Sequence, residues 1–271
     1  METILVGTDF SRAAFNAACY AVDMALAMNK EVLLLNIYTI PVSYGEVPMM
    51  INEEELVQDM ENELKKLKEQ LLLRTNNKVP IKTLERIGMF FIELDTVCGQ
   101  VKPYVVVLGS QGSTAAERLI LGGHTVYAMK HLNWPLIAVP PGAHFSGVKK
   151  IGLACDFSHV AETVPANKIK AFTKDLHAEL HILNIAKQQD KKPEIAGESE
   201  ALHQMLASAN PHYHYIVQQH TDQSIIDTAV TNGIDLLIVV PKHHDLLHVL
   251  THKSHTSQLT MHAKIPLMAL Q

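Results

Sequence analysis

The sequence has few cysteines, no long apolar run and no excess of basic charge, and each absence excludes a class of protein. Only three cysteines occur in 271 residues, far apart and without a Cys-x-x-Cys pair. This spacing argues against a disulfide framework or a cysteine zinc site. The formal net charge is −5, which argues against a general nucleic-acid binder because the phosphate backbone requires a basic face.

The chain also lacks the features of a membrane or secreted protein. No apolar run approaches the ~20 residues that span a bilayer. Residues 1–9 have no basic region and meet a carboxylate early, unlike a signal peptide. We therefore expect a cytoplasmic protein with no membrane partner.

Several familiar catalytic and nucleotide-binding motifs are missing as well. There is no Gly-x4-Gly-Lys-Ser/Thr segment, which excludes a P-loop. Gly7 stands alone after the first expected strand, so the Gly-x-Gly-x-x-Gly dinucleotide fingerprint is absent. No nucleophile with a base and an orienting third group is apparent, so the pattern favours binding over catalysis.

The sequence does contain an internal repeat. Asp-Phe-Ser occurs at residues 9–11 and again at 156–158, residues 32–37 match 180–185, and residues 135–139 match 266–270. The matches fall in the same order, which indicates duplication of a whole domain. The Pro- and Gly-containing segment 140–147 between the copies predicts domains at 1–143 and 148–271.

Short apolar runs alternate with helical segments in both copies. Copy one predicts strands at 3–6, 31–37, 81–86, 104–108 and 136–139, with helices after Ser11 and at 53–73, 89–101 and 122–131. Copy two predicts strands at 149–154, 178–185, 213–218, 235–240 and 267–270, with helices at 160–175, 198–209, 224–232 and 254–262. Alternation of this kind predicts an α/β fold: two tandem doubly wound domains, each with a five-stranded parallel sheet.

The segment 108–125 is typical of an anion-binding loop. It leaves a Val/Leu strand, passes small polar residues and enters a helix through a glycine pair. Glycines allow backbone N–H groups to approach a phosphate closely, and a helix N-terminus favours negative charge. Asp9, at the end of the first expected strand, would open onto the same crevice.

With residues 7–11 and the closing segment 134–140, this loop resembles the universal stress protein family. ATP-binding members of that family carry Gly-x2-Gly-x9-Gly-Ser/Thr. Gly109, Gly112 and Gly122 match its glycines, whereas Gly123 stands where Ser or Thr is expected. Thr125 matches a threonine that ATP-binding members often have.

The resemblance implies a fold of the adenine nucleotide alpha hydrolase type and a nucleotide site in copy one. It implies that Asp9 contacts the nucleoside and that backbone groups at Ile37 face adenine. Gln111 and His124, in the same segment, complete the predicted site. The resemblance also implies that the domains pair through their last strands, here within one chain as a pseudo-dimer, and a homodimer of the chain is a further possibility.

Copy two departs from this pattern. Its corresponding segment, 240–256, has no glycine: Pro241 replaces the first and His244 the second. Proline removes an N–H donor, and histidine adds bulk where a ligand must approach. We therefore expect a degenerate site in copy two.

The resulting hypothesis is a tandem universal stress protein that binds ATP or a related adenine nucleotide, with Mg²⁺ as a possible companion, and acts on an unidentified protein partner in a stress response. Enzymatic activity is at most slow ATP hydrolysis. An alternative is a nucleotide-free interaction scaffold in which Asp9 is simply a turn former beside Ser11. A third is a metal sensor, since His244, His248 and His252 share helical spacing, although a polar surface is the commoner explanation.

Overall fold

The computed structural model describes residues 1–38, 53–110, 123–155, 157, 159–185, 193–216, 221–241 and 265–271, with the side chains at 53, 185, 193–196 and 221–224 outside that description. The strands are β1 Thr3–Thr8, β2 Glu31–Tyr38, β3 Ile81–Ile87, β4 Val105–Gly109, β5 Leu136–Val139, β6 Lys150–Cys155, β7 Glu179–Ile185, β8 His212–Ile216, β9 Leu236–Val239 and β10 Leu267–Ala269. The helices are α1 Arg12–Met28, α2 Glu53–Arg74, α3 Phe90–Val101, α4 Gly123–His131, α5 Val160–Thr163, α6 Ala166–Asp175, α7 Pro193–Leu206, the 3₁₀ turn η2 Ala207–Ala209, and α8 Thr221–Thr231.

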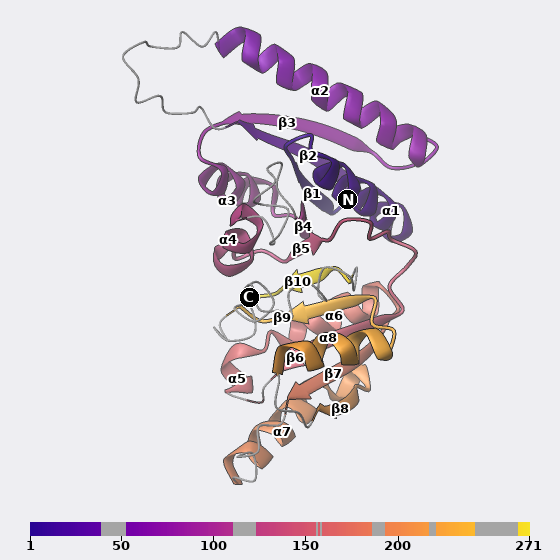
Figure 1. Ribbon diagram of the computed structural model, residues 1–271, viewed down its shortest axis with the longest axis vertical. Coiled ribbons are helices and arrows are strands. Elements are labelled where there is room, and N and C mark those ends of the chain that lie inside the picture. Colours follow the sequence, from indigo (N-terminus) through magenta and orange to yellow (C-terminus); the bar gives the residue numbers. More distant parts are fainter. Residues whose placement is uncertain are drawn as a thin grey trace.

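The strands form one ten-stranded sheet in the order β3-β2-β1-β4-β5-β10-β9-β6-β7-β8. Neighbouring strands are parallel within the first half, β1–β5, and within the second half, β6–β10. Figure 1 shows the two halves stacked along the long axis of the molecule. The prediction of two five-stranded parallel sheets is confirmed.

The two halves join through their last strands. β5 and β10 pair antiparallel, with Ile137 opposite Met268 at the centre of the seam. Both side chains are fully buried. The pairing confirms the expected pseudo-dimer within one chain.

Helices cover both faces of the sheet, and alternating strand residues divide the core into two layers. One layer packs under α1, α2, α6 and α7 and includes Val6, Leu34 and Ile182. The other packs under α3, α4 and α8 and includes Leu5 and Leu183. Each layer runs through both halves, so the seam is part of the core.

The first helix follows the sequence signals closely. Ser11 has an extended backbone, and its hydroxyl accepts a hydrogen bond from the Ala14 N–H at 3.2 Å. It is therefore the predicted N-cap. Small side chains then cover the buried face, and α1 ends at Asn29 in the left-handed conformation.

One predicted helix is wrong. Residues 160–175 form two helices, α5 and α6, separated by Val164 and Pro165. Val164 is extended, with φ −84° and ψ 114°. Proline disfavours the helical conformation of the preceding residue and has no N–H to donate, so the helix breaks there.

The three cysteines lie in the core. Cys19, Cys98 and Cys155 are all buried thiols. Burial raises the pKa of Cys98 to about 12, so its thiol is protonated. Among the described helices, none has an apolar stretch long enough to cross a membrane.

Candidate functional site

The strand order reverses between β1 and β4, because β2 and β3 lie on one side of β1 while β4 and β5 lie on the other. In open parallel sheets, ligands bind at the carboxyl ends of strands at such a reversal. Asp9 directly follows β1, and Gly109 is the last residue of β4. The fold therefore places these two predicted site residues at the strand reversal, where the ligand crevice of such sheets is expected.

A tight turn follows β1. Phe10 is left-handed, with φ 61°, and its N–H donates to Thr8 Oγ1 at 3.0 Å. The carboxylate of Asp9 accepts from the Ser11 N–H, also at 3.0 Å. Asp9 is exposed, so this carboxylate shapes the turn while remaining open to solvent.

The second half repeats two features of this strand end. Phe157 is left-handed like Phe10, with φ 56°. The buried Asn36 donates from Nδ2 to the Thr8 carbonyl at 2.7 Å, and the buried Asn184 donates to the Cys155 carbonyl at 3.1 Å. In each half, an asparagine of the second strand thus holds the carboxyl end of the first strand by a hydrogen bond.

Gly109 has a packing reason to be glycine. A Cβ at this position would lie 2.9 Å from the backbone carbon and oxygen of Ala13, in the first turn of α1. The end of β4 and the start of α1 therefore approach more closely than a side chain permits. Such an approach is one of the roles in which glycine is required.

The start of α4 is hydrogen-bonded to the end of β4. The Thr125 side chain is buried, and its hydroxyl donates to the Gly109 carbonyl at 2.8 Å. Gly123 is exposed, and a Cβ added there would have no described atom within 4 Å. His124 is also exposed and stacks on Phe90 of α3, with 4.9 Å between ring centroids.

Ile37 lies on β2, one residue beyond the end of the pairing with β1. The Glu31 N–H donates to the Glu2 carbonyl, so the backbone groups of Glu31 face the β1 side of β2. Backbone groups alternate in direction along a strand, so those of Ile37, six residues later, face the same side. β1 ends at Thr8, opposite Asn36. The next amide on that edge, the Phe10 N–H, donates to Thr8 Oγ1, and the paired register of β1 and β2 does not extend to Ile37.

Among the predicted site residues, the fold thus brings Asp9, Gly109 and Thr125 to the strand reversal, with Ile37 at the end of the neighbouring β2 and with Gly123 and His124 at the start of α4. The other three, Gln111, Gly112 and Gly122, lie outside the described residues. In the second half, the buried Pro241 follows β9 at the matching strand end. The candidate metal ligands His244, His248 and His252 also lie outside the description.

The profile of the universal stress protein family matches residues 1–140. The chain belongs to the universal stress protein family. The match covers the first half, and the second half is connected to it by the repeat and the shared strand order.

Solved structures of similar fold extend over both halves. A universal stress protein from Archaeoglobus fulgidus is 13% identical, covers 99% of this chain and 98% of its own, and has a TM-score of 0.70. A functionally unknown protein from Pseudomonas aeruginosa is 12% identical over 100% of this chain and 92% of its own, with a TM-score of 0.56. At these identities the likeness shows the tandem fold.

A universal stress protein solved in complex with cAMP is 23% identical over 51% of this chain and 96% of its own, with a TM-score of 0.39. No curated protein matches the chain.

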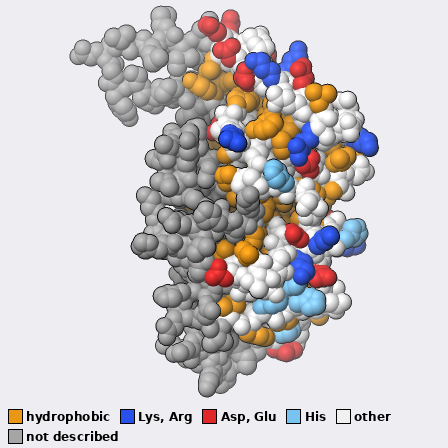
Figure 2. All heavy atoms as spheres, turned by 45° about the vertical axis from the view of Figure 1, so that its right-hand side comes forward, with side chains coloured by type: hydrophobic (Ala, Val, Ile, Leu, Met, Phe, Trp, Pro, Cys, Tyr) orange, Lys and Arg blue, Asp and Glu red, His pale blue; other side chains and the backbone are white. Residues whose placement is uncertain are grey.

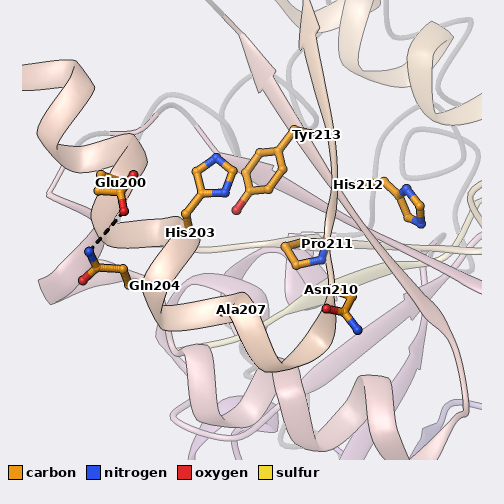
Figure 3. A pocket seen from close by; sticks show the side chains of 8 residues that line it. All are labelled: Glu200, His203, Gln204, Ala207, Asn210, Pro211, His212 and Tyr213. Atoms are coloured by element: carbon orange, nitrogen blue, oxygen red, sulfur yellow. Dashed lines mark hydrogen bonds between the residues drawn. The ribbon is translucent and has the colours of Figure 1, made fainter.

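This universal stress protein also has a pocket away from the crevice, between α7 and the start of β8 (Figure 3). Its volume is about 550 Å³, and its lining includes His203 and Tyr213, whose rings stack at 3.8 Å. Burial raises the pKa of Tyr213 to about 12. The pocket lies at the amino end of β8, whereas the reversal sites of this fold lie at carboxyl ends, so it is not the predicted nucleotide site.

Reasoning from the sequence missed two contributors to the crevice. Asn36 was visible as a polar residue inside an apolar strand in both copies, and a buried amide needs a hydrogen-bond partner. Phe90 gave no comparable signal, because its stacking on His124 depends on how α3 and α4 pack. Among the described residues, no group of three or more His, Cys, Asp or Glu is arranged to hold a metal ion.

Proposed function

We propose that this universal stress protein binds ATP or a related adenine nucleotide in residues 1–143, at the crevice between β1 and β4. The observation that carries the proposal is the strand reversal with Asp9 on one side and Gly109, bonded to Thr125, on the other. A glycine-flanked strand end beside a helix start suits a phosphate. The exposed carboxylate suits a ribose hydroxyl.

The proposed roles follow the polarity of each group. The Asp9 carboxylate accepts from the sugar, and the Ile37 carbonyl accepts from the adenine amine. Backbone N–H groups of the glycine segment and of the α4 start donate to phosphate oxygens. Mg²⁺ would accompany a triphosphate through its phosphate oxygens, and no protein ligand for it is assigned.

We further propose that residues 148–271 form a second domain that binds no nucleotide in this way. Pro241 cannot donate a backbone hydrogen bond, and no glycine follows it up to residue 256. Nucleotide occupancy of the first domain would then alter a surface read by a partner protein in the stress response. Cytoplasmic location and a homodimer of the chain belong to the same proposal.

Calorimetric titration with ATP, ADP and AMP tests the nucleotide site. The Asp9→Asn variant sharpens the test, because the asparagine carbonyl can still accept from Ser11 N–H while the charge is lost. We expect Asp9→Asn to weaken nucleotide binding by about tenfold, the worth of a hydrogen bond to a charged group, and to leave the unfolding free energy nearly unchanged.

Asp95→Asn is the matched control, since Asp95 is an exposed carboxylate on α3 in the same half. It should bind nucleotide as the parent does. Equal affinity of the Asp9→Asn and Asp95→Asn proteins would remove Asp9 from the site.

A second candidate function is a nucleotide-free interaction scaffold. The observation in its favour is that three described site groups already have internal roles. Asp9 accepts a hydrogen bond within the turn after β1, and Thr125 donates one to the Gly109 carbonyl at the end of β4. Gly109 itself lacks the Cβ that would clash with the backbone of α1. Absence of any binding heat with nucleotide at millimolar concentration would favour the scaffold over the nucleotide site.

A further inference from the structure

Three histidines from two neighbouring strands gather on one face of the sheet in the second half. His181 of β7 lies opposite His212 of β8. Its ring centroid is 5.0 Å from that of His212 and 5.2 Å from that of His214. Figure 2 shows that most of the visible histidine side chains lie in the lower part of the molecule, which Figure 1 shows to be the second half.

The three rings share one side of β8. His212 and His214 are two residues apart on a strand, so their side chains point to the same face. Figure 3 shows the His212 ring directed away from the rings of His203 and Tyr213, although all three residues line the pocket. We name His181, His212 and His214 the histidine cluster.

The central contact of the cluster requires a neutral imidazole. His181 Nδ1 and His214 Nε2 are 2.9 Å apart, a hydrogen-bond distance. One of these nitrogens must carry a hydrogen and the other must accept it. If both rings were fully protonated, two N–H groups would face each other and the contact would become repulsive.

The surroundings of His181 offer little support for a positive charge. The residue is 6% exposed, and its Nε2 has no hydrogen-bond partner among the described residues. The nearest carboxylate oxygen, Glu179 Oε2, is 3.5 Å from Nε2, and the Glu179 side chain is 60% exposed. A buried cation with so exposed a partner is poorly compensated.

Titratable groups of β6, β7, β8 and α8 surround the histidine cluster. β6 contributes Lys150, whose Nζ donates to the Asn232 carbonyl beyond α8. β7 contributes Glu179, and β8 contributes the two remaining histidines. α8 covers this face and has one titratable side chain in its described part, the exposed Asp227.

Burial, followed by repulsion from neighbouring cations, lowers the pKa of both His181 and His214. Glu179 opposes the shift at His181 without reversing it.

We propose that the histidine cluster is a pH-sensitive contact that holds strand β8 on the sheet at neutral pH and releases it as the pH falls. Among the described strands, β8 is the last in the sheet order and pairs with β7 alone, over five residues. Like β3 at the other edge, it depends on a single set of cross-strand contacts, and its paired register is shorter than that of β3.

The direction of the effect follows from proton linkage. A histidine with a lowered pKa in the folded state binds fewer protons there than in the open state. The stabilising contribution is therefore complete above the ordinary histidine pKa. It is lost as the pH falls through that value toward the lowered folded pKa. If opening takes up one proton, the opening constant rises about tenfold for each unit of pH in that window.

Hydrogen exchange of the β8 amides in the full chain tests the proposal. Protection factors of residues 212–216 are measured at about pH 7.5 and about pH 5.5, on either side of the ordinary histidine pKa. We expect protection of β8 in the parent to fall by about tenfold or more across this range. The β1 and β2 amides should show no comparable change.

His214→Gln is the diagnostic variant, because the glutamine oxygen can accept from His181 Nδ1–H but cannot take up a proton. We expect a weaker pH dependence of β8 protection than in the parent. His144→Gln is the matched control, since His144 is exposed and lies outside the strands and helices between β5 and β6. It should behave as the parent does.

Two results of the hydrogen-exchange experiment would overturn the proposal. One is β8 protection in the parent that does not change with pH. The other is the same pH dependence in His214→Gln and the parent. An NMR titration of the His181 ring in the parent adds a measurement that needs no variant, and a folded pKa at or above about 6.5 would also overturn it.

Discussion

At the scale of single residues, the candidate crevice uses groups that also serve local structure. Gly109 is needed for the approach of α1, and Asp9 supports the turn before it. Gly123 differs from both, because it is exposed and no described atom lies within 4 Å of where its Cβ would be. It is also the position at which this chain departs from the family pattern of Ser or Thr.

Gly123→Ser therefore tests whether the crevice accepts phosphate. No described atom lies within 4 Å of the added Cβ, so the free energy of unfolding should stay within about 0.5 kcal/mol of the parent. A hydroxyl beside a bound phosphate adds one hydrogen bond, worth about 1 kcal/mol, so ATP should bind about fivefold more tightly by calorimetry.

Gly99→Ser is the control for this change. Gly99 is exposed on α3 and also has no described atom within 4 Å of its Cβ position. Its serine variant should bind ATP with the parental affinity. If Gly123→Ser behaved like Gly99→Ser, no phosphate would lie beside residue 123.

At the scale of elements, local sequence signals determined where the first helix begins and ends. Ser11 caps α1 as expected, and Asn29 ends that helix in a left-handed conformation. The break between α5 and α6 also has a local sequence signal, because Pro165 lies inside the segment predicted as one helix. There the conformational restriction imposed by proline outweighs the apolar periodicity.

Replacing the cap should destabilise the first half. Ser11→Ala leaves the Ala14 N–H without its 3.2 Å acceptor at the start of α1. We expect the free energy of unfolding to fall by about 1 kcal/mol, measured by urea denaturation.

Ser146→Ala is the corresponding control, since Ser146 is an exposed serine outside any helix. It should change stability by less than about 0.5 kcal/mol. Equal effects of the two substitutions would mean that the cap contributes nothing beyond a surface hydroxyl.

At the scale of the whole molecule, the antiparallel seam makes one continuous sheet from two parallel ones. Ile137 and Met268 face each other across it and are fully buried. Both core layers continue through the seam. The two halves should therefore depend on each other for stability.

Met268→Lys places a charge in the middle of this seam. Because an unpaired buried charge is costly, we expect the free energy of unfolding to fall by about 3 kcal/mol or more, and the halves to unfold less cooperatively. Urea denaturation followed by circular dichroism measures both effects.

Met89→Lys is the matched control, since Met89 is 66% exposed. It should unfold within about 0.5 kcal/mol of the parent. A loss of less than about 1 kcal/mol for Met268→Lys would show that the seam does not couple the halves.

The sequence by itself determined the duplication, the alternation of strands and helices, and the residues at the end of β1. These follow from short-range chemistry: apolar periodicity, helix caps and turn-forming residues act over a few positions. The meeting of Asp9 with Gly109 could also be expected, because parallel sheets of this class bring strand ends together at their reversal.

Only the tertiary structure decided which groups lie side by side across strands and helices. The bond from Thr125 to Gly109, the stacking of His124 on Phe90 and the contact of His181 with His214 all join residues far apart in the chain. Their partners are set by strand register and helix packing, and neither is encoded in local spacing. For the same reason local spacing could not reveal the histidine cluster, in which the buried His181 of β7 contacts His212 and His214 of β8.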